Sequence, residues 1–264
     1  YHIDELKTLV RQRKSLKTQI NKDMNLLHAY VIQAFPEYYK IFKKINSKAS
    51  MEVLSRHASL SEFKRVRLET LKELIRKSSK GHHGLKEAQM LKELHSSSIG
   101  MDSSALSFSI KQTIERILMI DHQVHDIERE IVHHVDDSKT TLLSAPGVGY
   151  TTGAIILAEI GDIHRFKTDD QLLAYAGLDP SVYQSGNFEG NYKISKRGSS
   201  ILRWAVYQAA QAAVKFDPVF KAYYLKKKSE GKRHRVIIGH VTKKLLRVIR
   251  SILKNNTTYS LNTH

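Results

Sequence analysis

The sequence contains no cysteine, few prolines and no long apolar run. Without cysteine the chain has neither disulfides nor thiolate metal sites, and a reducing, cytoplasmic compartment fits this composition. The four prolines stand at positions 36, 146, 180 and 218, and their scarcity favours long helices in the first half. No apolar stretch reaches about 18 residues and no signal peptide is recognisable, so the sequence predicts no membrane segment.

Acidic residues are also scarce towards the C-terminus. Residues 193–264 contain 17 lysines and arginines but only two acids, Asp217 and Glu230, so they carry a net +15 of the chain's formal +17. A segment so unbalanced repels itself unless a polyanion neutralises it. Nucleic acid is the partner that this charge favours. The alternatives are a solvated basic face and an anionic membrane surface.

The size of the chain suits one large domain or two modest ones. Its 264 residues are 41% hydrophobic, which is enough for a genuine core. The chain begins with Tyr1 rather than methionine, within a segment that already has a helical pattern. We therefore expect a fragment whose N-terminal portion is missing.

Two long helices are expected in the first half. In residues 3–34 apolar side chains recur at spacings of three and four, Arg13 and Asp23 interrupt them, and Pro36 ends the helix. Residues 102–135, with Asp102 or Ser103 as N-cap, carry an unbroken seam made of Leu106, Ile110, Thr113, Ile117, Ile120, Val124, Ile127 and Ile131. Such regularity is typical of a coiled coil. The pattern predicts an antiparallel arm over residues 1–137, and pairing between subunits is equally compatible with it.

Shorter helices are expected between the two long ones. Residues 51–57, 61–78 with Ser61 as N-cap, and 85–96 have helical patterns, which gives a helical insert at about 46–100, at the tip of the arm. The loop at 80–84 contains His82 and His83. No third ligand has a suitable spacing, so we interpret this pair as solvated and predict no metal site.

Residues 138–264 are predicted to form a second, compact helical domain. Its start, residues 142–161, is similar to a helix-hairpin-helix motif, in which the backbone at Gly147 and Gly149 would approach a phosphate. The alternative is a tight turn that needs glycine for its backbone angles. Further helices are expected at 166–175, 199–216, 217–228 and 236–253. The last should turn Lys243, Lys244, Arg247, Arg250 and Lys254 outward. No strand is convincing, although 183–194 is compatible with one small β-hairpin, so the predicted fold class is mainly α.

A polar, glycine-rich loop leads into the helix expected at 199–216. Ser185 stands near its middle, and Lys193, Lys196 and Arg197 follow. Cations beside a helix N-terminus can offset the charge of a phosphate, which a serine hydroxyl could attack. Each element alone is an ordinary surface feature.

Five short motifs occur in order: Ala-Pro-Gly-Val-Gly at 145–149, Leu-Ala-Tyr-Ala-Gly-Leu-Asp-Pro at 173–180, Gln-Ser-Gly at 184–186, Ile-Ser-Lys-Arg-Gly at 194–198 and Leu-Arg at 202–203. Together they resemble the C-terminal domain of the DEDD-type insertion-sequence transposases, the family of the Piv invertases and the bridge-RNA-guided recombinases. The resemblance is strong over about 140–250. The arm fits the coiled-coil region of that family more loosely.

The resemblance implies a DNA transposase or recombinase of a prokaryotic cytoplasm, associated with the nucleoid. Such proteins combine a RuvC-like domain, whose four acids bind Mg²⁺, with a serine nucleophile that forms a phosphoserine with DNA. Ser185 matches that serine, and Ser195 is the second candidate. Asp169, Asp170 and Asp179 match none of the four acids, so we expect no cofactor in this chain, Mg²⁺ in the full-length enzyme, and no catalysis by the chain alone.

The resemblance also implies binding partners, and the sequence offers residues that could contact them. DNA, a guide RNA and a second copy bound through the arm are the expected partners. The residues expected to contact nucleic acid are Gly147, Gly149, Lys193, Ser195, Lys196, Arg197, Arg203, Lys243, Lys244 and Arg247. Two other functions stay open: a site-specific DNA invertase, and a non-catalytic module for nucleic-acid binding and oligomerisation.

Overall fold

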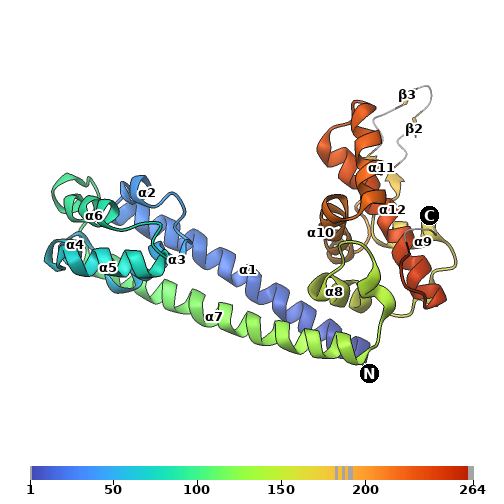
Figure 1. The fold of residues 1–264 in the computed structure, drawn as a ribbon, viewed down its shortest axis with the longest axis horizontal. Coiled ribbons are helices and arrows are strands. Elements are labelled where there is room, and N and C mark those ends of the chain that lie inside the picture. The colour runs from blue at the N-terminus through green and yellow to red at the C-terminus, as the bar shows by residue number, and fades with distance from the viewer. Residues whose placement is uncertain (1, 182–183, 186–187, 190–192, 261–264) are drawn as a thin grey trace. The chain divides into compact units, whose positions relative to one another are not determined.

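The computed structural model describes residues 2–181, 184–185, 188–189 and 193–260; side chains are described outside residue 2 and residues 181–193. The fold is mainly α, as predicted (Figure 1). It divides into two compact units, one of residues 14–126 and one of residues 1–13 with 127–264. Helices α1 (His2–Ala34) and α7 (Ser104–Asp137) contribute to both units. Helix α7 ends at Asp137, and the predicted division of the chain after residue 137 stays a prediction.

The unit of residues 14–126 combines parts of α1 and α7 with five shorter helices. These are α2 (Tyr38–Ile41), α3 (Lys48–Arg56), α4 (Leu60–Arg65), α5 (Leu68–Ser78) and α6 (Leu85–Ser97). Phe35, Tyr38 and Phe63 are fully buried at its centre, and the Phe35 ring lies 5.5 Å from each of the other two. This aromatic contact holds the short helices against the long ones.

The region predicted as one helix from 61 to 78 is two helices, so that prediction is wrong. Val66 and Arg67 are extended between α4 and α5. The break frees backbone carbonyls, and the Lys92 ammonium donates to the carbonyl of Val66 at 2.8 Å. The N-cap is Ser59, not Ser61. Its hydroxyl accepts from the Glu62 N–H, and the Glu62 carboxylate accepts from the Ala58 N–H.

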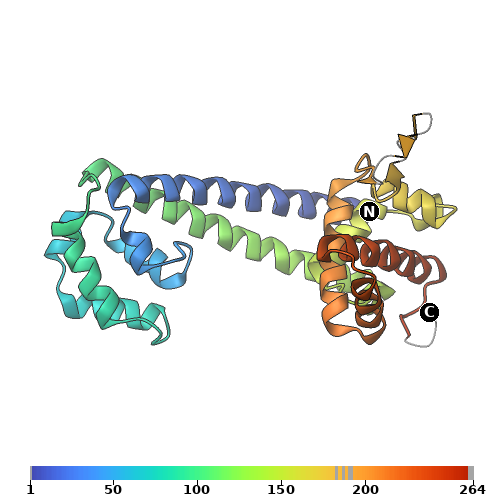
Figure 2. The same ribbon diagram turned by 90° about the horizontal axis from the view of Figure 1, so that it is seen from above.

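The seam predicted on α7 is buried within the chain. Ile110 and Val124 are fully buried and Ile117 is 5% exposed, whereas Leu106 is half-buried. Within residues 14–126, α1 and α7 lie side by side in both views (Figures 1 and 2). Their ion pairs, Lys17–Asp121 and Asp23–Arg116, show that they run antiparallel. The same seam is therefore not free to join two subunits.

The two polar residues that interrupt the apolar pattern of α1 form interhelical ion pairs. Asp23 is 3% exposed, and Arg116 donates to its two carboxylate oxygens at 2.7 and 2.9 Å. In the other unit, Arg13 donates to Glu128 at 2.6 and 2.8 Å. Asp23 and Arg13 are thus each paired with a charged group of the facing helix, which fixes the register of the two helices.

The second unit is built mainly of four α-helices that follow the two long ones: α8 (Tyr150–Ile160), α10 (Ser200–Phe216), α11 (Pro218–Ser229) and α12 (His234–Asn255). The smaller elements are η1 (Thr141–Ser144), η2 (Ile163–Arg165) and α9 (Asp169–Tyr175). Alanines of α10, among them Ala205, Ala209 and Ala213, are fully buried, so the neighbouring helices approach α10 closely. None of the described helices is long and apolar enough to cross a membrane.

Among the residues that the structure describes, strands form two short pairs. Strand β1 (Pro180–Ser181) pairs antiparallel with β4 (Lys193–Ile194), and β2 (Gln184–Ser185) pairs antiparallel with β3 (Phe188–Glu189). These pairs fall in and beside the segment that the sequence marked as compatible with a β-hairpin.

Candidate nucleic-acid interface and serine loop

The loop that carries Ser185 closes at its base through backbone hydrogen bonds. Beyond the β1–β4 pair, the Ser195 N–H donates to the Asp179 carbonyl at 2.9 Å, and the Lys196 N–H donates to the Gly177 carbonyl at 3.0 Å. The two legs of the loop are therefore bonded together over residues 177–181. At the loop end, the backbone of Ser185 pairs with Phe188. The side chains of Ser185 and Lys193 lie outside the described part of the structure.

Two glycines let the returning leg pack against the end of α9. Gly177 has a positive φ of 63°, and a Cβ on Gly198 would lie 2.0 Å from the Tyr175 carbonyl oxygen. Just after Gly198, the Ser199 N–H donates to that carbonyl at 2.6 Å. A side chain at position 198 would open this contact, so the motif Ile-Ser-Lys-Arg-Gly has a packing reason to end in glycine.

Side chains reinforce the base of the loop. The Ser195 hydroxyl donates to the Asp179 carboxylate and accepts weakly from the Arg197 N–H at 3.4 Å. Ser195 is therefore already engaged in the loop. The sequence interpretation found no role for Asp179. Its partner Ser195 lies 16 positions further along the chain. Only a predicted strand pairing of residues 180 and 194 could have brought the two side chains together.

The first turn of α10 is fixed from the end of α8. The Ser199 hydroxyl is the N-cap, which accepts from the Leu202 N–H at 3.1 Å and donates to the Glu159 carboxylate at 2.6 Å. The Tyr175 hydroxyl donates to the Glu159 carbonyl at 3.1 Å. Glu159 thus joins three helices at one point. Sequence reasoning missed it because a single glutamate near a helix end carries no signal of its partners.

The cations predicted to meet phosphate differ in their present contacts. Lys196 and Arg197 are exposed, and Lys196 has a positive φ of 56°. Arg203, by contrast, donates through Nη1 to the Ala176 carbonyl at 2.7 Å. Lys196 and Arg197 can therefore reach a ligand directly, while Arg203 stabilises the backbone beside Gly177 and offers only its remaining N–H groups.

Gly147 and Gly149 play different parts in the turn before α8. Gly147 has a φ of +75°, and a Cβ there would lie 2.1 Å from the Ala209 carbonyl oxygen of α10. Gly149 is exposed, and a Cβ there would meet no atom within 4 Å. At Gly147 the positive φ and the packing on α10 both require glycine, as expected for a tight turn. Gly149 has open space beside it, although its N–H donates to the Thr152 hydroxyl at 3.0 Å. The element before the turn is the short η1 rather than an α-helix.

Helix α12 presents fewer free cations than the sequence predicted. Arg250 is not outward: its side chain is 11% exposed, pairs with Asp169 at 2.9 Å and donates to the carbonyls of Phe166 and Lys167. Arg247 lies 4.0 Å from both Asp169 and Asp170. Arg250 therefore holds the segment before α9 on α12, and a phosphate would have to compete with two carboxylates for Arg247.

Lys243 and Lys244 are both half-buried on α12. The ammonium of Lys244 lies 5.1 Å from the centre of the Tyr223 ring and 5.7 Å from that of Phe220. This cation–π contact orients Lys244 along α11 without neutralising its charge.

The two acids of the basic segment are both engaged. Asp217 caps α11 by accepting from the Phe220 N–H at 2.9 Å. Glu230 accepts from Lys227 at 2.9 Å and lies 3.9 Å from Lys232. Burial, followed by the charges of Lys232, Lys227 and Lys243, lowers the pKa of His240. Lysine charges thus contribute to the surroundings of His240 near the turn between α11 and α12.

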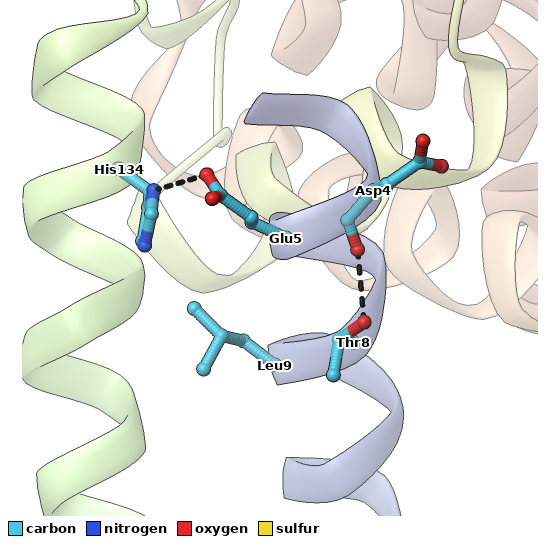
Figure 3. Close-up of a pocket in the computed structure, with 5 residues that line it drawn as sticks. All are labelled: Asp4, Glu5, Thr8, Leu9 and His134. Carbon is cyan, nitrogen blue, oxygen red and sulfur yellow. Dashed lines mark hydrogen bonds and ion pairs between the residues drawn. The ribbon is translucent and has the colours of Figure 1, made fainter. Parts of the chain in front are cut away.

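The described residues offer no metal site, because no three of their His, Asp or Glu side chains converge on one point. A recess near the N-terminus lies between α1 and α7 within one unit (Figure 3). His134 points into it towards Glu5, with 3.7 Å between Nδ1 and the carboxylate, and Thr8 donates to the Asp4 carbonyl. The His134–Glu5 contact joins the two helices, the Thr8–Asp4 bond lies within α1, and neither supplies a catalytic arrangement.

Comparison with known proteins identifies the domain that carries these features. Residues 139–225 match the family described as "Transposase IS116/IS110/IS902 family". An uncharacterized protein of insertion element IS116 from Streptomyces clavuligerus is 31% identical over 147 residues, 55% of this chain and 37% of that protein. One of insertion element IS110 from Streptomyces coelicolor is 22% identical over 259 residues, 97% of this chain and 64% of that protein.

A relative of a different name also matches. The pilin gene-inverting protein of Moraxella bovis is 27% identical over 159 residues, 59% of this chain and 49% of that protein. The matches span less than two thirds of the length of each of these three curated relatives. The resemblance stated from the motifs is confirmed by these comparisons, since residues 139–225 match the IS116/IS110/IS902 transposase family.

Proposed function

We propose that this chain binds DNA and supplies the serine nucleophile of a transposase of the DEDD type. Ser185 would attack a DNA phosphodiester and hold the cut strand as a phosphoserine. The observation that carries the proposal is the closed base of the Ser185 loop, which leads through the exposed Lys196 and Arg197 into α10, inside the matched transposase domain.

The closed base supports a nucleophilic role because a nucleophile has to be positioned. Backbone bonds at Gly177 and Asp179, together with the Ser195–Asp179 side-chain bond, hold the two legs together at the base of the loop. The Glu159–Ser199 bond fixes the helix to which the loop returns. A loop on such a rigid base presents its residues with little loss of entropy on substrate binding.

The charge distribution supports DNA as the substrate. Both acids among residues 193–264 are engaged within the chain, and exposed cations of this segment such as Lys196 and Arg197 are available to phosphates. Lys196 and Arg197 lie next to the helix that follows the loop, where they would offset the charge that builds up on the attacked phosphate. The cations of α11 and α12 would bind the flanking backbone without regard to sequence.

The proposed reaction conserves the energy of the phosphodiester. A bond forms between the Ser185 hydroxyl oxygen and phosphorus, and the serine proton is lost. The bond from phosphorus to one deoxyribose oxygen breaks, and that oxygen takes up a proton to become a free hydroxyl. Attack of another DNA hydroxyl on the phosphoserine reverses the sequence and releases Ser185.

Other parts of the proposal rest on the resemblance alone. These are the RuvC-like domain with its Mg²⁺, the guide RNA, and self-association through the arm. The described residues contain no donor set for Mg²⁺, so no step above is routed through the metal. Any self-association through the arm would use a face other than the α7 seam, because that seam is buried within the chain.

A site-specific invertase is the second candidate function. It uses the same proposed chemistry, and the match to the pilin gene-inverting protein over 59% of the chain favours it. A non-catalytic module that only binds nucleic acid is the third. Its sites would be the cations alone, with Ser185 as an ordinary turn residue.

The test is a recombination assay with a full-length protein that includes the expected RuvC-like domain. Ser185→Ala should abolish recombination and leave DNA binding unchanged, because one oxygen is lost from an otherwise intact loop. Ser181→Ala, at the loop base, is the matched control and should keep most of the activity. Full recombination by Ser185→Ala would support the non-catalytic module instead.

A further inference from the structure

The only tryptophan of the chain lies exposed on the first turns of α10. Trp204 is 48% exposed and follows Arg203, whose guanidinium holds the backbone beside the Ser185 loop. At spacings of three and four along the same face stand Ser200, Gln208, Gln211 and Lys215. A tryptophan usually buries most of its large apolar ring, so an exposed one on an ordered helix marks a surface that meets a partner.

The opposite face of α10 holds this ring in place. Leu202, Ala205, Val206 and Ala209 are fully buried against neighbouring elements, and Ser199 caps the helix through Glu159. The exposure of Trp204 is therefore not the result of a loosely packed helix. The ring stands on a rigid support, as is required of a platform on which another flat ring stacks.

The charge around Trp204 selects among possible partners. Helix α10 contains no acid from Ser200 to Phe216, and the exposed Lys196 and Arg197 immediately precede its N-cap. An aromatic ring flanked by cations, with glutamine amides on the same face, fits a strand that offers phosphates, unstacked bases and hydrogen-bonding edges. A protein partner would more often meet a surface from which charge is depleted.

We propose that Trp204 stacks on an unpaired base of the nucleic acid next to the Ser185 loop. The inference rests on the proposed function, and it names the form of the substrate at this point: a strand locally free of its complement. Arg197 and Lys196 would hold the adjacent phosphates, and the Trp204 ring would replace the stacking that the base loses when it leaves the duplex.

Because Trp204 is the only tryptophan, its fluorescence reports this contact directly. The 264-residue chain is titrated with a thymine-only single-stranded oligonucleotide and with a blunt duplex of mixed sequence, and end-labelled anisotropy measures binding in parallel. The single strand should quench the emission in step with binding, and the blunt duplex should quench it much less. Trp204→Ala should weaken single-strand binding by about 5- to 150-fold, the range of one lost base stack.

Two further variants separate stacking from other causes. Trp204→Phe keeps a ring and should recover most of the affinity. Phe108→Ala removes a 67% exposed ring from the other unit and should leave both the single-strand affinity and the quenching of Trp204 unchanged. Circular dichroism checks that each variant is folded.

The inference is overturned if anisotropy shows tight binding while the emission is unchanged, or if Trp204→Ala binds as the wild type does. It is also overturned if Trp204→Ala dissociates a dimer seen by light scattering, because the partner is then a second copy. In those cases the proposed function stands on its own recombination assay. Absence of all nucleic-acid binding would overturn both.

Discussion

Ser195 and Asp179 are joined twice, once through the backbone and once through their side chains. The Ser195 N–H donates to the Asp179 carbonyl, and the Ser195 hydroxyl donates to the Asp179 carboxylate. This double contact closes the loop that carries Ser185. We therefore expect Ser195 to position the loop, with Asp179 as its partner.

Loss of this contact should impair recombination more than binding. Asp179→Ala and Ser195→Ala should each lower recombination by roughly 10- to 100-fold, the usual cost of misplacing a reacting group by about 1 Å. DNA affinity measured by anisotropy should change little. The double variant should be no worse than either single variant, since both remove the same contact. Strictly multiplicative losses would contradict this account.

The two glycines before α8 should respond oppositely to substitution. Gly147→Ala places a Cβ against the Ala209 carbonyl at a positive φ and should destabilise the protein by about 2–4 kcal/mol. Gly149→Ala meets open space and should leave stability within about 0.5 kcal/mol. Chemical denaturation measures both.

If the backbone of Gly149 approaches a phosphate, Gly149→Val should weaken DNA binding in a protein that is still folded. Unchanged affinity would remove Gly149 from the interface and leave the turn a purely structural feature.

The stability of the arm should fall in acid through Asp23. Hydrogen bonds from Arg116 lower the pKa of Asp23, against the opposing effect of burial. Its contribution is therefore fully present above the unfolded pKa of about 3.9 and is lost as the pH falls through the lower folded value. Asp23→Asn should lower the free energy of unfolding by about 1–3 kcal/mol at neutral pH. Below about pH 4 the variant should lose less stability than the wild type does. If the melting temperature of Asp23→Asn falls with decreasing pH as steeply as that of the wild type, this prediction is contradicted.

DNA binding should depend on the cations near the α11–α12 turn. Neutralising the exposed Lys226, Lys228 and Arg235 with glutamine should reduce the slope of log affinity against log salt by roughly 0.9 for each lost phosphate contact. Glutamine at the exposed Lys40, Lys43 and Lys44 of the other unit is the matched control. Equal slopes in both triple variants would place the interface elsewhere.

The same surface should report DNA through His240. Neighbouring lysines contribute to its lowered pKa, so phosphates that offset their charge should raise that pKa when DNA binds. NMR titration of the imidazole with and without duplex DNA measures the change. A pKa that falls or stays constant would show that the DNA does not reach this turn.

The long helices could be predicted because their periodic patterns extend over many turns, as for the seam from Ile110 to Ile131. The break at Val66 and Arg67 could not, since neither residue is a helix breaker and the freed carbonyl of Val66 is satisfied by Lys92 from a later helix. The cap at Ser59 was within reach, because Ser59 and Glu62 have the spacing of a capping box.

The site was predictable only as a set of candidates. The motifs brought out Ser185 and the cations that follow it. They could not show that Arg203 and Arg250 bind backbone carbonyls, or that Asp179 and Glu159 hold the loop and the helix after it. These contacts join residues far apart in the sequence, and their partners are set by tertiary packing rather than by local pattern.

Ser185 is expected to form the covalent bond to DNA. A full-length protein that includes the expected RuvC-like domain is incubated with a suicide DNA substrate that traps the cut strand. Adducts are resolved on denaturing gels and mapped by peptide mass spectrometry. The wild type should give one adduct, on the peptide that contains Ser185, and Ser185→Ala should give none while still binding DNA. An adduct that persists in Ser185→Ala, or that maps to Ser195, would contradict the assignment.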